Sequence, residues 1–356
     1  MESVIKQALS HVIDPDLKKD IITLNMVKDI NVQGHEIKFT FVLTTPVCPL
    51  KEQLRQDCID AIHKHVGENY SVDIEFTSQV TTQRKDNFAQ LEGIKNIIAV
   101  ASGKGGVGKS TIAANLAIQL AAEGAKVGLL DTDIHGPSVP LLFDLENAKP
   151  KVEEAGKNVK MFPIEKHGVK LNSVGFLVPS NQALVWRGPM LSSALKQLFL
   201  DTVWGELDYL IIDMPPGTGD IHLTLSQQFP LTAAIVVTSP QEISLIDARK
   251  CVEMFQAKQI EIPILGVVEN MSYFTPAELP EKRYYLFGKG GGEKLAAAYG
   301  VPLLGQVPMI LEGDEENPQE KALAFSAESP LHPFAQSLAQ KVAQQVAIQN
   351  AAALAT

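Results

Sequence analysis

A glycine-rich stretch organises this sequence: Gly103-Lys104-Gly105-Gly106-Val107-Gly108-Lys109-Ser110-Thr111. It fits the pattern G-x-x-x-x-G-K-[ST], whose glycines let the backbone turn tightly and point successive N–H groups at a phosphate. Before it, residues 94–101 form a short apolar run; after it, residues 110–123 are rich in alanine and leucine and end at Gly124. The pattern therefore lies between a predicted buried strand and a predicted helix, which is the setting that phosphate binding requires.

The end of this loop carries the predicted chemistry. A lysine at the position of Lys109 reaches the β- and γ-phosphates of a nucleotide, and a hydroxyl at the position of Ser110 binds Mg²⁺. The alternative is a glycine-rich turn that binds nothing. The agreement between the motif and its flanking elements argues against that alternative, so residues 103–111 are predicted to bind a nucleotide phosphate.

The composition excludes several classes of protein. With 356 residues the chain is long enough for two domains, and 45% hydrophobic with 20% charged residues is ordinary for a soluble globular protein. The net charge of −10 provides no global basic field for nucleic acid. No run approaches the ~18 apolar residues of a membrane span, and the first residues lack the basic-then-apolar order of a signal peptide. We therefore expect a cytoplasmic protein without a membrane or nucleic-acid partner.

Residues 1–80 are predicted to form a small α+β domain. Their periodicity indicates the order α-β-β-α-β, with the elements at residues 3–12, 26–32, 36–42, 49–66 and 70–76. Residues 81–93 are polar and aperiodic, and we interpret them as a linker.

From residue 94 onward, apolar strands alternate with helical patterns, which predicts an α/β domain with a mostly parallel, helix-flanked sheet over residues 94–345. Further strands are expected at 126–131, 208–213, 233–239, 264–269 and 303–307. Helices are expected at 190–200, 220–228, 241–256 and 291–299. Residues 146–160 are charged and poorly periodic, which indicates an exposed excursion. The stretch 333–356 is predicted to be helical and to fray over residues 346–356.

Three carboxylates are expected beside the P-loop. Asp131 and Asp133 follow one predicted strand, and Asp213 ends another apolar strand, so all three lie at the carboxyl edge of the sheet. A carboxylate that ends a buried strand in this setting holds Mg²⁺ through water, which is the role we assign to Asp213. Residues 214–219 combine prolines with glycines, as expected of a turn that senses the γ-phosphate. Alternatively, Asp131 and Asp133 simply form a turn.

The second lysine of the loop, Lys104, resembles the extra lysine in the deviant Walker A motif of ParA, MinD and the nitrogenase iron protein. That resemblance implies a homodimer in which Lys104 crosses the interface to the partner's nucleotide. It also implies that Asp133 orients the hydrolytic water, and that Asp131 contacts a water bound to Mg²⁺. Asn270 would recognise adenine, which favours ATP. Lys104, Lys109 and Asp133 are thus the expected catalytic residues.

The combination of motifs resembles the Mrp/ApbC family over nearly the whole chain. The motifs are the loop itself, DTDIHGPS at 131–138, WRGPM at 186–190, DMPPGTGD at 213–220 and TTPVCP at 44–49. The resemblance implies a slow ATPase that carries iron–sulfur clusters to apoproteins, with ATP and Mg²⁺ as cofactors. Within these motifs, His135 is expected to be structural or to respond to the switch.

One departure from this family puts the cargo in doubt. The family's cluster ligands are a C-x-x-C pair just after Asn270-Met271-Ser272, where this chain has YFTPAELP at 273–280. Either the cluster is held elsewhere, or the chain has kept the ATPase and lost the cargo. Cys48 is the remaining candidate ligand, because it precedes a predicted helix whose N-terminus would favour thiolate. Its alternative role is that of a small buried apolar residue, as expected for Cys58 and Cys251.

Two other functions compete with cluster delivery. One is a ParA- or MinD-like positioning or scaffold ATPase that acts on DNA, membrane or partner proteins. Overall acidity disfavours DNA, and the single cation Lys341 after Pro333 disfavours a basic membrane-binding tail. The other is a maturation chaperone for metalloproteins that binds no cluster itself.

Overall fold

The computed structural model describes the chain except for residues 85–87, 135, 156–157, 178–187, 277, 280, 311–322, 324–327 and 354–356. The chain forms two compact units. Residues 1–83 and 343–356 make up the first, and residues 84–342 make up the second.

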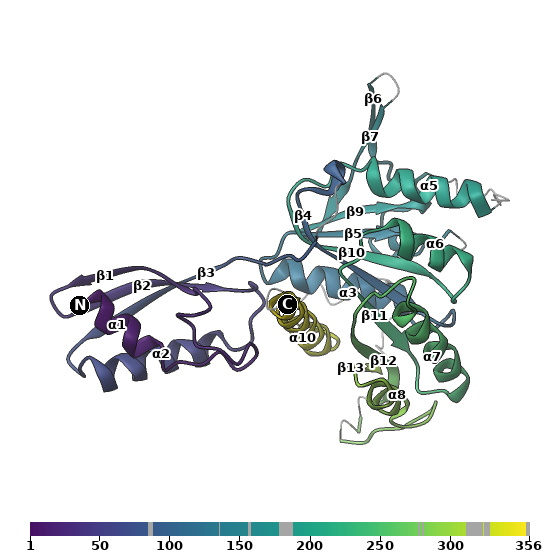
Figure 1. Cartoon of the computed structure of the whole chain (residues 1–356). Coiled ribbons are helices and arrows are strands. Elements are labelled where there is room, and N and C mark those ends of the chain that lie inside the picture. The colour runs from purple at the N-terminus through teal and green to yellow at the C-terminus, as the bar shows by residue number, and fades with distance from the viewer. Residues whose placement is uncertain are drawn as a thin grey trace. The chain divides into compact units, whose positions relative to one another are not determined.

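The first unit contains a three-stranded sheet of β1 (Val27–Gln33), β2 (Glu36–Leu43) and β3 (Ser71–Ser78). β1 and β2 form an antiparallel hairpin that turns at Gly34, whose φ is +60°, and β3 pairs with β2 in parallel. Helices α1 (Glu2–Leu9) and α2 (Lys51–His65) bury their apolar stripes with the inward face of this sheet (Figure 1). The predicted order α-β-β-α-β is confirmed.

The second unit is built on an eight-stranded sheet with the order β13-β12-β11-β4-β10-β5-β9-β8. The edge strand β8 is antiparallel to its neighbour, and the other pairings are parallel. The strands are β4 (Ile94–Ser102), β5 (Val127–Asp131), β8 (Ile164–Lys166), β9 (Val169–Ser173), β10 (Leu207–Pro216), β11 (Ala233–Thr238), β12 (Ile264–Phe274) and β13 (Leu303–Met309). This confirms the predicted α/β class with a mostly parallel sheet.

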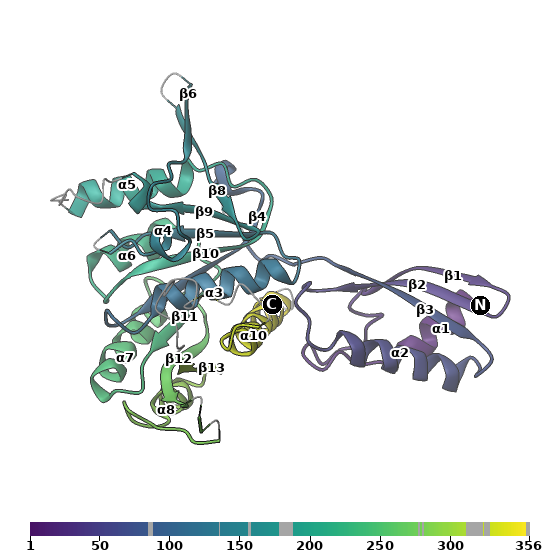
Figure 2. The same ribbon diagram turned by 180° about the vertical axis from the view of Figure 1, so that it is seen from behind.

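Helices cover both faces of this sheet (Figures 1 and 2). Among the described residues, the helices of this unit are α3 (Lys109–Ala122), α4 (Val139–Leu142), α5 (Gly188–Leu200), α6 (Asp220–Gln228), α7 (Glu242–Gln256) and α8 (Gly291–Tyr299), with 3₁₀ turns η1 (Ala89–Leu91) and η2 (Val174–Phe176). A further helix, α10 (His332–Ala353), begins in this unit and ends in the first. The central strands β4, β10 and β11 are buried almost throughout, as expected for parallel strands that are covered on both faces. α5 to α8 share one continuous apolar core with them.

Three parts of this unit differ from the sequence expectations. The exposed excursion contains an antiparallel hairpin of β6 (Lys151–Ala155) and β7 (Asn158–Phe162), which projects away from the sheet (Figure 1). The alternation of Val159 and Met161 with polar neighbours is too short to predict a strand, and residues 151–154 are mostly charged, so the hairpin could not be recognised. β8 and β9 were missed because they are short and partly polar. β12 runs through Asn270 to Phe274 rather than ending near it.

No helix in the described part of the chain is both long enough and apolar enough to span a membrane.

Candidate functional site

The glycine-rich loop connects the end of β4 to the start of α3, as predicted. Gly106 and Gly108 have φ values of +79° and +80°, in the left-handed region that glycine tolerates best. Gly103 lies so close to α7 that an added Cβ would be 2.1 Å from the carbonyl oxygen of Asp247. The loop therefore needs glycine for its backbone turn at two positions and for close packing at a third.

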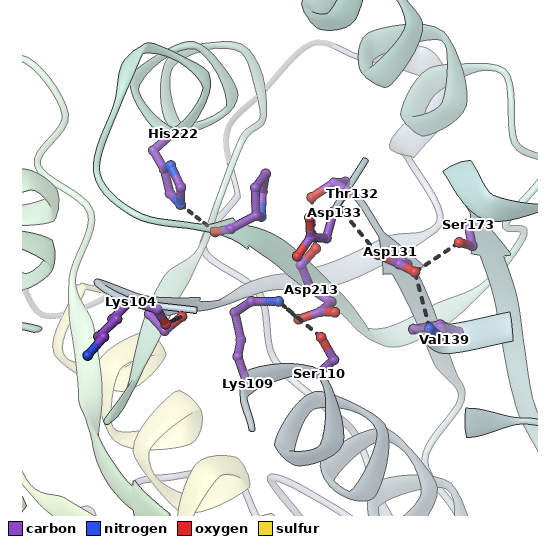
Figure 3. Close-up of polar contacts among 12 residues, drawn as sticks. Lys104, Lys109, Ser110, Asp131, Thr132, Asp133, Val139, Ser173, Asp213 and His222 are labelled. Carbon is purple, nitrogen blue, oxygen red and sulfur yellow. Dashed lines mark hydrogen bonds and ion pairs between the residues drawn. The ribbon is translucent and has the colours of Figure 1, made fainter. Parts of the chain in front are cut away.

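Lys109 and Asp213 form a buried ion pair beside this loop (Figure 3). The Lys109 ammonium contacts Oδ1 of Asp213 and lies 3.2 Å from the hydroxyl oxygen of Ser110. Asp213 belongs to β10, where it is level with Asp131 of β5, so both carboxylates reach the same edge of the sheet. Thr132 ties the two strands together, since its N–H and its hydroxyl both donate to the Asp213 carbonyl oxygen.

The second carboxylate oxygen of Asp213, Oδ2, is buried and has no hydrogen-bond partner within the described part of the chain. A buried carboxylate oxygen without a partner is costly unless a ligand or water satisfies it. The Ser110 hydroxyl lies close by, because the Lys109 ammonium contacts both Ser110 and Asp213. Carboxylate and hydroxyl oxygens are suitable ligands for Mg²⁺, so Ser110 and Asp213 fit the predicted metal site.

Asp131 is fully buried and accepts three hydrogen bonds from residues that the structure describes (Figure 3). Its Oδ1 accepts from the Asp133 N–H at 3.0 Å, and its Oδ2 accepts from the Val139 N–H at 3.2 Å and the Ser173 hydroxyl at 2.9 Å. Burial, and then the nearby charge of Asp213, raise the pKa of Asp131 to about 7. Asp131 thus joins the end of β5 to α4 and β9. Its contact with a Mg²⁺-bound water stays a prediction.

Asp133 is also buried, with 8% of its surface exposed. Figure 3 shows it beside Thr132 on the side of Asp213 that faces away from Ser110. The sequence placed all three carboxylates at one edge of the sheet, and the structure brings them together there. Sequence reasoning did not identify Ser173. The available signal was its place at the end of a short parallel strand, where side chains reach the same edge.

The turn after Asp213 is held by two contacts from outside it. The Gly217 N–H donates to the Ser102 carbonyl oxygen at the end of β4, at 2.9 Å. His222 of α6 is buried, and its Nε2 donates to the Pro215 carbonyl oxygen at 2.6 Å, because a carbonyl can only accept (Figure 3). Burial is the main cause that lowers the pKa of His222. No sequence signal singled out His222, which follows the predicted switch in an ordinary helix.

Lys104 and Asn270 reach the loop in different ways. Figure 3 shows the Lys104 side chain directed away from Lys109 and Asp213. The carbonyl oxygen of Lys104 accepts a hydrogen bond from Ser102 at 2.9 Å, so its backbone is tied to the end of β4. Asn270 approaches from β12, and its amide donates to the carbonyl oxygen of Val107 at 2.9 Å. The predicted contact of Asn270 with adenine stays a prediction.

Cys48 lines a small pocket in the first unit. The pocket is formed by Asp14, Asp16, Leu17, Met26, Leu43, Thr44, Thr45, Cys48, Pro49, Gln344 and Ala347. Burial is the largest effect on Cys48 and raises the pKa of its thiol; the charges of Asp14 and Asp16 raise it further, and a backbone hydrogen bond at Leu50 lowers it. The expected preference for thiolate is therefore wrong, since burial outweighs the N-terminal end of α2.

The other two thiols are inaccessible. Cys58 and Cys251 are fully buried, as expected, and burial raises the pKa of each to about 12. Within the described ranges, no three His, Cys, Asp or Glu side chains are grouped so that they could hold a metal ion. The position expected for C-x-x-C begins with Tyr273 and Phe274 at the end of β12, where Phe274 pairs with Tyr284. His135, Trp186 and Arg187 lie outside the described residues.

Comparisons with known proteins show which family this chain belongs to. Residues 93–347 match the ParA family model described as NUBPL iron-transfer P-loop NTPase, and residues 2–75 match an iron–sulfur cluster assembly protein model. An iron–sulfur cluster carrier protein of Synechocystis sp. is 48% identical over 297 residues, 83% of each chain. One of Escherichia coli is 41% identical over 348 residues, 97% of this chain and 92% of the relative.

A solved structure is also similar to part of this chain. A nucleotide-binding protein from Archaeoglobus fulgidus, in complex with ADP, is 38% identical with a TM-score of 0.53. The match covers 62% of this chain and 84% of that one.

Proposed function

This chain belongs to the NUBPL iron-transfer P-loop NTPase family, and we propose that it is an ATP-hydrolysing carrier that transfers iron–sulfur clusters to target apoproteins. One observation carries the nucleotide part of the proposal. Lys109 and Asp213 form a buried ion pair next to Ser110, at the carboxyl edge of a parallel sheet where a glycine loop begins a helix. Such an edge is where α/β proteins bind phosphates.

In the proposed mechanism, the triphosphate competes with Asp213 for the Lys109 ammonium. The backbone N–H groups of residues 103–111 surround the phosphates and stabilise the charge that develops during transfer. Ser110 and Asp213 would hold Mg²⁺, which would supply positive charge to neutralise the phosphates. Asp133 positions the attacking water. Hydrolysis is slow, because the nucleotide acts as a conformational switch.

Calorimetric titration with ATP tests this nucleotide site. Lys109→Ala is expected to weaken ATP binding about 100-fold, because it removes a charged donor from the phosphates. Lys95→Ala is a matched control. Lys95 lies at the start of β4, at the end of the strands opposite to the P-loop, and its Nζ is 2.8 Å from Oδ1 of Asp208 on β10. Unchanged affinity in Lys109→Ala would remove the phosphate-binding role of the loop.

We also propose a homodimer that closes on the nucleotide, with Lys104 reaching the partner's phosphates. The direction of its side chain, away from its own Lys109 and Asp213, is compatible with such a role (Figure 3). Light scattering with a slowly hydrolysed ATP analogue should show a doubled mass for the wild type and a smaller shift for Lys104→Ala. The same mass with and without the analogue would argue against the dimer.

The cluster part of the proposal requires ligands that replace C-x-x-C. Of the three cysteines, all in described positions, Cys48 is the one whose side chain is not fully buried. We propose it as a ligand to the transferred cluster. The lack of a C-x-x-C pair at residues 273–280 favours a second candidate, an ATP-driven chaperone for metalloproteins that binds no cluster. Anaerobic reconstitution of the wild type and Cys48→Ser separates the two. Cluster absorbance that depends on Cys48 supports the carrier, and absence of absorbance in both supports the chaperone.

A further inference from the structure

Asn270 lies outside the P-loop but contacts it directly. It belongs to β12, where it is level with Val307 of β13, and only 8% of its surface is exposed. Its Nδ2 donates a hydrogen bond of 2.9 Å to the carbonyl oxygen of Val107, in the middle of the glycine loop. A strand that is distant in the sequence therefore holds a loop carbonyl.

This contact determines the direction of the next N–H group. A trans peptide unit is planar, so its C=O and N–H point in opposite directions. When the Val107 carbonyl points towards Asn270, the Gly108 N–H must point in the opposite direction within the same peptide plane. Loop N–H groups with fixed directions are what a phosphate site uses. The Asn270 amide thus orients a donor that it does not touch.

Gly108 and Asn270 are also matched in shape. A Cβ added to Gly108 would lie 2.2 Å from Nδ2 of Asn270, and Gly108 has a φ of +80°. The amide therefore occupies the space that any side chain at position 108 would need. Glycine at this position serves the backbone turn and the close approach of Asn270 together.

The strand that carries Asn270 is itself firmly held. The preceding residue, Glu269, is buried and accepts hydrogen bonds from Gln306 of β13 at 2.9 Å and from the Gly292 N–H at the start of α8. The Ser272 hydroxyl donates to the Glu269 carbonyl oxygen at 2.7 Å. An amide on such a rigid element is a more precise anchor than one on a mobile loop.

From these contacts we infer that Asn270 is a positioning residue of the P-loop. It fixes the Val107–Gly108 peptide for phosphate binding, regardless of which base the nucleotide carries. The inference rests on the proposed nucleotide binding and deepens it. It differs in outcome from the adenine contact that the family resemblance implies. Loss of a base contact changes the preference for ATP over GTP, whereas loss of the anchor weakens every ligand that carries the phosphates.

The test compares Asn270→Asp and Asn270→Ala with Asn96→Asp. Asn96 is a matched control: it is fully buried in β4, and its amide also donates to a backbone carbonyl, that of Asp208, at the other edge of the sheet. Calorimetry with ATP, GTP and inorganic triphosphate should show about tenfold weaker binding of each in both Asn270 variants, with an unchanged ratio of ATP to GTP affinity. Asn270→Ala covers the case in which a buried carboxylate prevents folding.

Hydrogen–deuterium exchange of peptides from residues 103–112, in protein without nucleotide, gives a readout that does not depend on binding. Exchange should be faster in the Asn270 variants and unchanged in Asn96→Asp. If exchange stays at the wild-type rate, or if triphosphate binds normally while the ATP to GTP ratio changes, the inference is overturned. A wild-type protein that binds no nucleotide would refute the proposed function, and the exchange measurement would still decide whether Asn270 anchors the loop.

Discussion

The P-loop edge of the sheet and the pocket around Cys48 both contain carboxylates, yet their charges are arranged in opposite ways. At the P-loop, Asp213 is paired with the Lys109 ammonium, and a phosphate would find a cation and loop N–H groups in place. Around Cys48, the charged lining residues are Asp14 and Asp16, both acidic, and the pKa of the thiol is raised. The nucleotide site therefore already contains the cation and N–H groups that a phosphate needs. A thiolate at Cys48, in contrast, needs positive charge that the iron ions of a bound cluster would supply.

The largest expected effect comes from breaking the buried ion pair. Lys109→Met leaves the Asp213 carboxylate buried without its cation, and we expect a loss of about 3–5 kcal/mol in the free energy of unfolding. Lys109→Met with Asp213→Asn removes both charges and should recover most of that loss without restoring ATP binding. Urea denaturation of the three proteins measures the difference. A double variant as unstable as the single one would show that charge pairing is not what holds this edge together.

The close packing of the loop against α7 is expected to have the next largest effect. Gly103→Ala would place a Cβ 2.1 Å from a backbone oxygen, which cannot move unless α7 shifts, so we expect a loss of about 1–3 kcal/mol. Gly105→Ala is the control, because its added Cβ would lie 3.8 Å from Pro216. Thermal unfolding should separate the two variants by several degrees. Equal melting temperatures would mean that the close packing of Gly103 against α7 does not contribute to the stability of the protein.

The nucleotide site could be predicted from the sequence because its signals are local. The loop, its lysine and its serine are contiguous, and Asp213 ends a strand whose apolar run marks it as central. The geometry of a parallel sheet then brings these residues together. Contacts between distant segments left no such signal. The Asn270 amide and the Val107 carbonyl are 163 positions apart, and Ser173 lies on a strand that was not recognised.

The prediction that the N-terminus of the following helix favours thiolate at Cys48 failed for a related reason. The sequence argument considered only the helix that follows Cys48, and its N-terminal dipole would favour thiolate. Burial of the thiol depends on residues from several segments, among them Gln344 and Ala347 of α10, which no local pattern connects to position 48. Asp14 and Asp16 add charge of the wrong sign for a thiolate. Burial by residues that are distant in the sequence therefore raises the pKa of the Cys48 thiol.

An effect of similar size is expected from the hydroxyl that supports Asp131. Ser173→Ala removes the hydrogen bond to the Asp131 carboxylate and also the acceptor of the Gly175 N–H, and it should cost about 1–3 kcal/mol. Ser226→Ala is the matched control, since its buried hydroxyl has no hydrogen-bond partner in the part of the chain that the structure describes. Its loss should change the free energy of unfolding by less than about 0.5 kcal/mol. Similar losses in both variants, measured in urea, would show that the hydrogen bond to Asp131 contributes little.

The smallest expected effect concerns reactivity and tests the other half of the comparison. Because the pKa of Cys48 is raised, little thiolate is present at neutral pH, and its alkylation by iodoacetamide should be slow. The rate should rise about tenfold per pH unit without a plateau up to the ordinary thiol pKa. Cys58 and Cys251 should stay unmodified in the folded protein, whereas all three cysteines should react after denaturation. Mass spectrometry locates the label, and Cys48→Ser is the blank. A plateau below about pH 8 would mean that the helix N-terminus, not burial, controls this thiol, and the contrast with the P-loop edge would disappear.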